Sequence, residues 1–322
     1  MKKIVIYLAA VICLGISCSE DVEVNPELAG PLYGLTKGEA GSVDELIYQT
    51  WEEWNMYYLY DYEPYAFQVK NWSGSFNKWY TPMKPENKEL IRKLIDIVQN
   101  GIFVGMDKDL VQGSWFFRTF LCDSLCDASD YNASKVVANY LDNGDCIIIP
   151  GFGERMQGYT DEDWEALKEE LSSLLISRLY KGAAEQPDAF FDLRMKKADG
   201  SEVTIMDSWL GGMDIIPDPD GKYSNGTYTF RLNGYIEGIS VGIMMMVPER
   251  DVDFADYISF LTKTEKTELE YNFRVFPKVL ERAALLVPYL MRVLSMDLDA
   301  MQQANCPDDP VEDGYFANLK YE

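Results

Sequence analysis

The chain contains no histidine among its 322 residues. A Ser-His-Asp triad is therefore impossible, because no imidazole is present to accept the serine proton. Nucleophilic catalysis by a cysteine–histidine pair is excluded for the same reason. Zinc sites with histidine ligands are excluded too, which disfavours a zinc hydrolase of the usual three-ligand kind. Most common hydrolytic mechanisms are thus removed before any motif is considered.

Basic residues are also scarce, since 29 lysines and arginines stand against 53 acidic residues, for a net charge of −24. Nucleic acids and anionic membrane surfaces are bound through basic surface, so this balance disfavours both as partners. Hydrophobic residues, in contrast, make up 47% of the chain, and 13% of it is aromatic. This content is enough for a packed core and argues against disorder.

The N-terminus has the pattern of a targeting segment. Lys2 and Lys3 precede the apolar run Ile4–Ile16, which is shorter than the roughly 20 residues needed to cross a bilayer. A short apolar run after basic residues is typical of a cleaved signal peptide. The run ends in Leu14-Gly15-Ile16-Ser17-Cys18, which resembles a lipobox. We therefore expect residues 1–17 to be a lipoprotein signal peptide and Cys18 to carry the acyl chains of a membrane anchor.

The residues after Cys18 indicate where the protein is held. Ser19-Glu20-Asp21 resembles the acidic surface-export signal of Bacteroidetes lipoproteins. Prolines and glycines then recur as far as Gly41, which predicts an acidic tether over residues 18–41. We expect a lipid-anchored protein of the outer membrane that faces outward, with the periplasmic face as the alternative. The folded domain is expected over residues 42–322.

Four cysteines remain for other roles in the expected domain: Cys122, Cys126, Cys146 and Cys306. Disulfides are permitted outside the cytoplasm, and four cysteines allow three pairings. Zinc binding is a weaker interpretation, because Cys122-x-x-x-Cys126 has neither a second pair at matching spacing nor a histidine partner.

Hydrophobic periodicity and capping residues predict an α+β fold that is rich in helices and has a small sheet. Helices are expected over Ser42 to about Tyr60, Pro85–Val98, Asp161–Lys181 behind a Thr160 cap, 251–261, 268–282 and 285–294. Strands are expected at Trp115–Leu121, Cys146–Ile149 and Tyr228–Leu232, with a hairpin turn at Asp199-Gly200. Pro277 and Pro288 are expected to break or kink the C-terminal helices, and Gly234–Val247 has no assignment.

Two short motifs suggest chemistry, and each has a structural interpretation that we favour. Gly238-Ile239-Ser240-Val241-Gly242 matches the nucleophile elbow of serine hydrolases. Its base cannot be a histidine, so a packed glycine-rich segment is preferred. Asp218-Pro219-Asp220-Gly221 resembles part of a calcium loop, yet the full set of alternating ligands is missing. A solvated turn is preferred there.

Carboxylates and aromatic rings leave a second kind of site open. Glycoside hydrolysis needs two acids held roughly 5–10 Å apart, and among 53 acidic residues the sequence nominates no pair. Core packing explains large rings more often than sugar stacking does. The candidates for a sugar-stacking platform are Trp72, Trp79, Tyr80 and Trp115.

Several segments follow one another in the order of a known family: Leu46–Tyr48 with Tyr58–Tyr62, Cys122–Ser124 with Tyr131-Asn132, Val252–Ser259, and Leu285–Leu298. Together they resemble the zinc-binding metallopeptidase lipoproteins of Bacteroidetes. The resemblance covers most of the chain after the tether. It implies a metallopeptidase-like fold for residues 42–322.

The resemblance also implies where a zinc site would lie. The family's His-Glu-x-x-His motif falls on the helix expected over Asp161–Lys181. Ser173 and Ser177 stand at the two histidine positions, and Leu174 stands at the position of the general-base glutamate. Asp253 and Asp256 match a later acidic segment, where a metal-binding or supporting carboxylate is implied. The chain is therefore expected to be a degenerate member of the family, with no metal and no other cofactor.

The leading hypothesis is a non-catalytic cell-surface lipoprotein, a pseudo-peptidase. It would bind a protein or a glycan in the former catalytic groove, as an accessory to nutrient uptake at the outer membrane. One alternative is a carboxylate-based hydrolase, such as a glycoside hydrolase. Another is a structural or assembly lipoprotein, which would expose an apolar patch rather than a deep pocket.

Overall fold

A computed structural model describes residues 31–62, 78–127, 135–137, 139–205, 207, 214–241 and 244–321. Cys18, Trp72 and Tyr131-Asn132 lie outside the described residues. The chain divides into two units, Met1–Lys37 and Gly38–Glu322. Every helix and strand named in the following paragraphs belongs to the second unit.

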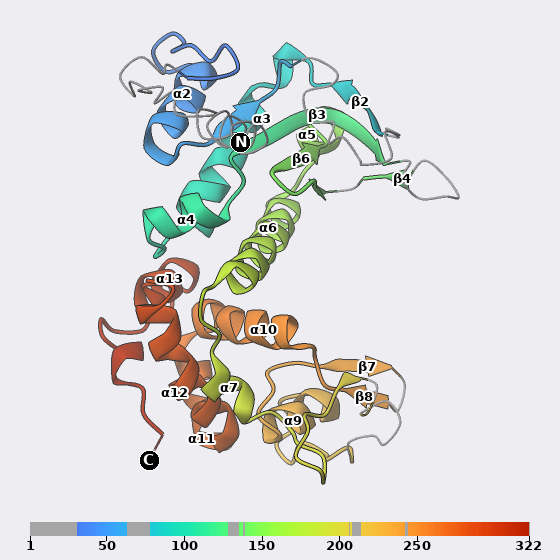
Figure 1. Ribbon diagram of the computed structural model, residues 1–322, viewed down its shortest axis with the longest axis vertical. Coiled ribbons are helices and arrows are strands. Elements are labelled where there is room, and N and C mark those ends of the chain that lie inside the picture. The colour runs from blue at the N-terminus through green and yellow to red at the C-terminus, as the bar shows by residue number, and fades with distance from the viewer. Residues whose placement is uncertain are drawn as a thin grey trace, which may run out of the picture. The chain divides into compact units, whose positions relative to one another are not determined.

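A mixed six-stranded sheet is built around the long strand β3, Arg118–Asp127 (Figure 1). The first half of β3 lies between β1 (Tyr57–Leu59) and β6 (Cys146–Pro150), and both run parallel to it. In this half Phe120, Leu121 and Cys122 are apolar and buried, and so are Ile147–Ile149 of β6, as expected of parallel strands inside a core.

The second half of β3 has different neighbours. It pairs antiparallel with β2 (Lys78–Pro82) and β4 (Lys135–Val136), while β5 (Leu141–Asp142) pairs antiparallel with β6. The last parallel pair is Cys122 with Pro150. Strand β3 therefore changes neighbours on both sides near Cys122, and a crevice can open where the adjacent strands end.

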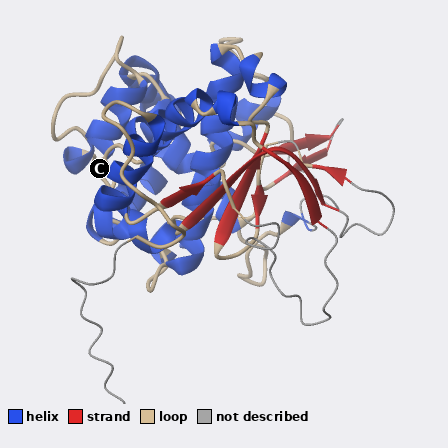
Figure 2. Cartoon of the chain, turned by 90° about the horizontal axis from the view of Figure 1, so that it is seen from above, coloured by secondary structure: helices blue, strands red, loops and turns tan. Residues whose placement is uncertain are grey.

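The sheet is flanked by α2 (Val43–Trp54), the 3₁₀ helix η2 (Pro85–Asn87), α3 (Glu89–Ile97), the π-helical turn η3 (Val98–Ile102), α4 (Lys108–Ser114) and α5 (Glu154–Gln157). Figure 2 shows most of the helices gathered to one side of the strands. Among the described residues, no helix is long and apolar enough to cross a membrane.

The long helix α6, Asp161–Gly182, contacts α4 and η3 and also contacts α10. Its N-terminus has the predicted Thr160 cap, in the form of a capping box: the Asp163 N–H donates to Thr160 Oγ1 (3.3 Å), and the Thr160 N–H donates to the Asp163 carboxylate (2.9 Å). Near its other end, Tyr180 packs on Phe254 with ring centroids 5.2 Å apart.

The C-terminal half is mostly helical. Its elements are α7 (Asp188–Asp192), α9 (Asn225–Leu232), β7 (Ile239–Val241), β8 (Met244–Met246), α10 (Arg250–Lys263), α11 (Lys266–Val275), α12 (Pro277–Arg292), α13 (Leu298–Asn305) and η4 (Phe316–Asn318). The strands β7 and β8 form a separate two-stranded sheet. With the six-stranded sheet, these helices make the fold α+β and helix-rich, as predicted.

Several predicted elements were wrong in type or extent. Tyr228–Leu232 belongs to helix α9 and is not a strand, because the Ser224 hydroxyl accepts from Thr227 N–H and caps a helix there. The first helix ends at Trp54 rather than near Tyr60, because Asn55 adopts a left-handed conformation (φ +54°) that closes it.

The expected strand Trp115–Leu121 begins later than predicted, whereas the expected helix break at Pro277 is confirmed, because α11 ends at Val275. Strand β3 starts only at Arg118. Pro277 opens α12, a position that needs no backbone N–H. Pro288 lies inside the same helix and does not end it.

Candidate functional site

The three positions implied for a zinc motif lie on α6 but do not form a site. Ser173 is exposed, and Leu174 and Ser177 are half-buried. The buried side of the helix consists of other residues, namely Trp164, Leu167, Leu171, Leu175, Ile176 and Leu179. Among the described residues, no group of three or more His, Cys, Asp or Glu side chains is arranged to hold a metal ion.

Asp253, on α10, belongs to a buried ion cluster. Its carboxylate accepts hydrogen bonds from Arg194 and from Arg282, the latter through Nη2 to Oδ2 at 2.6 Å and Nη1 to Oδ1 at 3.1 Å. The side chains of all three residues are at most 2% exposed. Asp253 therefore holds together the end of α7, helix α10 and helix α12, and its oxygens are occupied by guanidinium groups.

The two arginines of this ion cluster have further partners. Arg194 Nη2 donates to the Pro248 carbonyl (2.6 Å), and Arg282 Nη1 donates to the Gly234 carbonyl (2.5 Å). Arg194 also pairs with Glu202, which in turn accepts from Arg250 at 2.6 Å. The charges of the cluster are thus paired within the protein, as buried charges require, although Arg282 Nε is buried and has no hydrogen-bond partner among the described residues.

Asp256 lies one turn further along α10 and is half-buried. Burial is the main cause that raises its pKa to about 7, and the nearby carboxylates of Asp253 and Glu237 contribute to the same increase. Within the described part of the chain, no hydrogen bond joins Asp256 to Ser173 or Ser177. The positions that the resemblance brings together are therefore not brought together by contacts of this kind.

The remaining motif residues have structural explanations. Ser240 lies within strand β7, which forms a hairpin with β8 instead of turning into a helix. A Cβ on Gly238 would lie 2.2 Å from Phe230, so glycine is required there for packing. The Asp218 carboxylate accepts from the backbone N–H groups of Asp220 (3.0 Å) and Tyr223 (2.7 Å), as in a locally bonded turn.

The four cysteines do not form disulfides, and all four thiols are free. None of the three pairings that the sequence permits is therefore formed in the structure. Cys122 is buried, and burial raises the pKa of its thiol to about 12, which disfavours a thiolate. Trp115 is a core residue, only 5% exposed and packed edge-on against Phe103 and Phe116.

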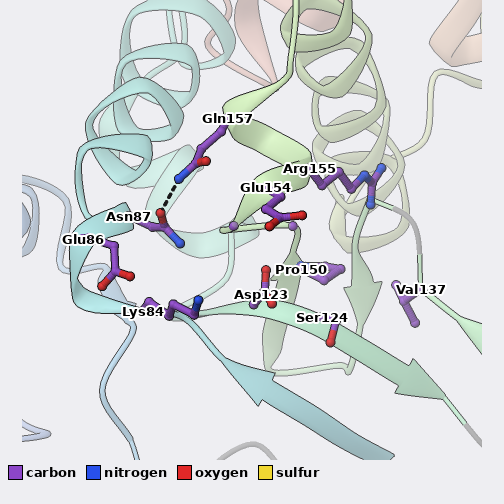
Figure 3. A pocket seen from close by; sticks show the side chains of 12 residues that line it. Lys84, Glu86, Asn87, Asp123, Ser124, Val137, Pro150, Glu154, Arg155 and Gln157 are labelled. Carbon is purple, nitrogen blue, oxygen red and sulfur yellow. Dashed lines mark hydrogen bonds between the residues drawn. The ribbon is translucent and has the colours of Figure 1, made fainter.

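A cleft of about 540 Å³ opens beside β3, at the point where β6 ends. We call it the polar cleft and define it by six side chains that line it: Lys84, Glu86, Asp123, Ser124, Glu154 and Arg155. They come from the segment before α3, from β3 and from α5. Figure 3 shows Asp123 and Glu154 in the middle of this group, with Lys84 on one side and Arg155 on the other.

The loop after β6 forms one wall of the polar cleft. Gly151 adopts a positive φ of +111°, which favours glycine, and its N–H donates to the carbonyls of Cys122 (3.0 Å) and Asp123 (2.8 Å). Two residues later, a Cβ on Gly153 would lie only 1.8 Å from Asp123 Oδ1. The absence of a side chain at Gly153 therefore leaves the space that the Asp123 carboxylate occupies.

A buried amide fastens this loop to the opposite wall. Asn87 is 5% exposed; its Nδ2 donates to the Phe152 carbonyl (3.0 Å), and its Oδ1 accepts from Gln157 Nε2 (2.6 Å). Figure 3 shows the bond between Asn87 and Gln157. The position of α5 relative to η2 is thus fixed by two side-chain hydrogen bonds.

The polar cleft carries charges of both signs that are not used for folding. In the described part of the chain, no hydrogen bond or ion pair engages the side chains of Lys84, Asp123 or Glu154. Such groups can bind the hydroxyl, amide or charged groups of a ligand. Sequence reasoning missed this cleft. The available signal was that an apolar strand, Cys146–Ile149, ends in Pro150-Gly151, which is typical of the carboxyl edge of a parallel sheet.

Comparisons with known protein families, with curated proteins and with solved structures found no match.

The raised pKa of Asp256 predicts a pH-dependent stability. Between pH 4 and pH 7 the folded chain binds more protons at Asp256 than the unfolded chain, whose carboxyl keeps its ordinary pKa of 3.8. Its contribution to the free energy of unfolding therefore falls as the pH rises through this range. The Asp256→Asn variant should gain thermal stability over the wild type at pH 8 but not at pH 5.

Thermal melts at both pH values test this expectation. Asp251→Asn, on the same helix, is the matched control, and its difference from the wild type should not change between the two pH values. An equal effect of Asp256→Asn at pH 5 and pH 8 would contradict the raised pKa.

The close approach of Asp123 to Gly153 predicts that substitutions at these two positions have non-additive effects on the free energy of unfolding. Gly153→Ala should destabilise the protein by about 1–3 kcal/mol, because the new methyl group must displace the carboxylate. The cost should be smaller in an Asp123→Ala background, where the space is free. Denaturant unfolding of the two single variants and the double variant measures the coupling.

Gly113→Ala is the control for this cycle, because no atom lies within 4 Å of a Cβ at Gly113. It should be neutral or slightly stabilising in its helix. Additive costs for Gly153→Ala and Asp123→Ala would show that the two positions do not compete for the same space.

Proposed function

We propose that the chain is a lipid-anchored lipoprotein of the cell envelope whose domain, residues 42–322, binds a ligand without transforming it. Cys18 carries the lipid, and residues 18–41 form the spacer. The acidic Ser19-Glu20-Asp21 supports an outward-facing position on the outer membrane. The resemblance to zinc-binding metallopeptidase lipoproteins supports a pseudo-peptidase that assists nutrient uptake.

The observation that carries the non-catalytic proposal is the environment of Asp253. A metal ligand must direct a free oxygen lone pair into an open site. Both oxygens of Asp253 instead accept from guanidinium groups, and the side chain is 1% exposed. The carboxylate that the resemblance associates with metal binding therefore serves the packing of α10 against α12.

The polar cleft is the place where we expect the ligand. Its volume, about 540 Å³, lies within the range of about 300–1,000 Å³ that is usual for small-molecule sites. It lies beside the sheet and not on the α6 surface that carries Ser173 and Ser177. The ligand site of the proposal is thus a different surface from the former catalytic groove.

One observation favours a second candidate, a carboxylate-based hydrolase. Asp123 and Glu154 line the same cleft, and glycoside hydrolases use two acids on either side of the bond that they cleave. Under this alternative one of the two acids protonates the leaving oxygen, and the other acts as the nucleophile or activates a water molecule. Turnover of a glycan would decide between the two candidates.

The non-catalytic proposal predicts that zinc is not retained. The mature protein, equilibrated with Zn²⁺ and dialysed, should hold far less than one zinc per chain when its metal content is measured. Stoichiometric zinc that is lost on Ser173→Ala or Asp253→Asn would overturn the proposal.

The Asp253→Asn variant also reports on the structural role of the ion cluster. Removing one partner of a buried ion pair should cost about 3–5 kcal/mol of unfolding free energy, because the opposing charges stay buried. Asp251→Asn changes a carboxylate in the first turn of the same helix and should cost below about 1 kcal/mol.

The anchor proposal predicts that Cys18 is the single site of lipid attachment. In cells given radiolabelled palmitate, the wild-type chain should be labelled and recovered with the outer membrane. Cys18→Ala should abolish the labelling and release the protein from the membrane fraction. Cys13→Ala, inside the signal segment, is the matched control and should leave both unchanged. Undiminished labelling of the Cys18→Ala variant would contradict the anchor.

A further inference from the structure

A second cleft lies on the other side of β3, where β1 and β2 end. Its volume is about 340 Å³. We call it the tyrosine cleft and define it by six residues that line it: Tyr60, Asp61, Tyr62, Tyr80, Met83 and Lys88. Three aromatic rings, an acid and a base thus surround one hollow, which is unlike the purely apolar lining of a core void.

The aromatic wall of the tyrosine cleft is held in place by packing. Tyr62 and Tyr80 stack with ring centroids 5.3 Å apart and an angle of 28° between the rings. Phe120 meets Tyr62 edge-on at 4.9 Å, and the Tyr62 hydroxyl donates to the Leu121 carbonyl (3.2 Å). The two rings are therefore fixed before any ligand arrives, so little side-chain entropy is lost on binding.

The polar groups of the tyrosine cleft are arranged around these rings. Lys88 Nζ lies 4.5 Å from the centre of the Tyr60 ring and 3.1 Å from the Asp44 carboxylate, which also accepts from the Tyr60 hydroxyl. Asp61 is exposed at the rim. In the described part of the chain, Asp61 makes no hydrogen bond or ion pair, so its carboxylate can accept from a ligand.

The two clefts share a wall, the segment of residues 82–88. Met83, Pro85 and Lys88 line the tyrosine cleft, whereas Lys84 and Glu86 line the polar cleft. Asp123 in the middle of β3 lines the polar cleft, and the tyrosine cleft is connected to the same strand by the hydrogen bond from the Tyr62 hydroxyl to the Leu121 carbonyl. The two clefts are therefore neighbours on either side of this segment, and a ligand that contacts both must be longer than one small ring.

The chemistry of this pair of clefts selects one class of ligand. A sugar ring presents an apolar C–H face that stacks on tyrosine, and hydroxyl groups that donate to carboxylates and accept from lysine or arginine. The polar cleft has three acidic and two basic side chains among its six defining residues, and the whole chain has a net charge of −24. A polyanionic glycan would be repelled.

We propose that the tyrosine cleft and the polar cleft form one binding site for a neutral oligosaccharide. One sugar ring stacks in the tyrosine cleft, and the hydroxyl groups of a following unit are held in the polar cleft. This inference rests on the proposed binding function and adds the ligand class to it.

Affinity electrophoresis of the mature protein tests the inference. Native gels would contain one soluble polysaccharide each: starch, xylan, galactomannan or mixed-linkage β-glucan as neutral probes, and polygalacturonate as the acidic probe. We expect at least one neutral probe to retard the wild type and the acidic probe to have no effect. Tyr80→Ala should weaken the retardation roughly tenfold, the value of losing one aromatic contact.

Two further variants distinguish a loss of binding from a loss of folding. Asp61→Asn changes only an exposed rim group and should weaken binding while leaving the melting temperature unchanged. Tyr321→Ala removes a ring that is 47% exposed and lies outside both clefts, so it should bind like the wild type. Asp123→Asn tests the polar cleft separately.

The possible results distinguish a failure of this inference from a failure of the proposed function. Binding that is lost in Asp123→Asn but unchanged in Tyr80→Ala and Asp61→Asn would overturn the role of the tyrosine cleft and keep the binding function. Retardation by the acidic probe alone, or by none of the probes, would overturn the ligand class. Release of reducing sugar that Asp123→Asn or Glu154→Gln abolishes would overturn the non-catalytic proposal and favour the hydrolase.

Discussion

The helical half of the domain depends on one buried carboxylate, that of Asp253. Three charged side chains, Arg194, Asp253 and Arg282, meet where almost no solvent reaches. Taking them out of water costs several kcal/mol per ion, and only close geometry and further hydrogen bonds compensate. Here the compensation comes from the carbonyls of Gly234 and Pro248. The relative positions of α10, α12 and the end of α7 are therefore coupled to this single group.

Aromatic rings complete the environment of these guanidinium groups. The Arg282 guanidinium carbon lies 4.1 Å from the centre of the Phe190 ring and 4.9 Å from that of Tyr257, and Tyr235 lies 5.3 Å from Arg194. Ring faces attract cations and contact the flat guanidinium without needing hydrogen bonds. The same residues that neutralise charge also fill the core, so a metal ion could not replace them without repacking. The carboxylate oxygens of Asp253 are therefore used by the fold and are not free to bind a ligand.

The sequence predicted features that depend on local interactions. The Thr160 cap and the apolar periodicity of α6 are set within one or two helical turns, and the strand at Cys146 is a continuous apolar run. Local signals failed where an unexpected residue ended or began an element. Asn55 closes α2 through a left-handed conformation, and Ser224 caps a helix whose tyrosine and threonine residues resemble a strand. A single capping residue outweighs the propensity of its neighbours in both cases.

The clefts could not be predicted for a different reason. Asp123 and Glu154 are distant in the sequence, and they share a cleft only because β3 and β6 pair in parallel up to Cys122 and Pro150. The hydrophobic periodicity of the sequence does not show which residues of two strands pair with each other. The tyrosine cleft is still harder to predict from the sequence, because the hydrophobic pattern places Tyr60 at the end of a helix and Tyr62 beyond it. Of the rings proposed for a sugar platform, Tyr80 does line a cleft, whereas Trp115 is buried in the core.

The chemistry of the polar cleft follows from how the backbone is used around it. The loop after β6 directs the N–H groups of Gly151 and Phe152 back to the carbonyls of Cys122 and Asp123. The carbonyl groups of Cys122 and Asp123 are therefore hydrogen-bonded at the point where the neighbouring strand β6 ends. The Asp123 side chain, in contrast, has no hydrogen-bond partner among the described residues. Its carboxylate fits in this position because Gly153 has no Cβ. A cleft built in this way keeps its shape when empty, which favours binding by preorganisation over binding by rearrangement.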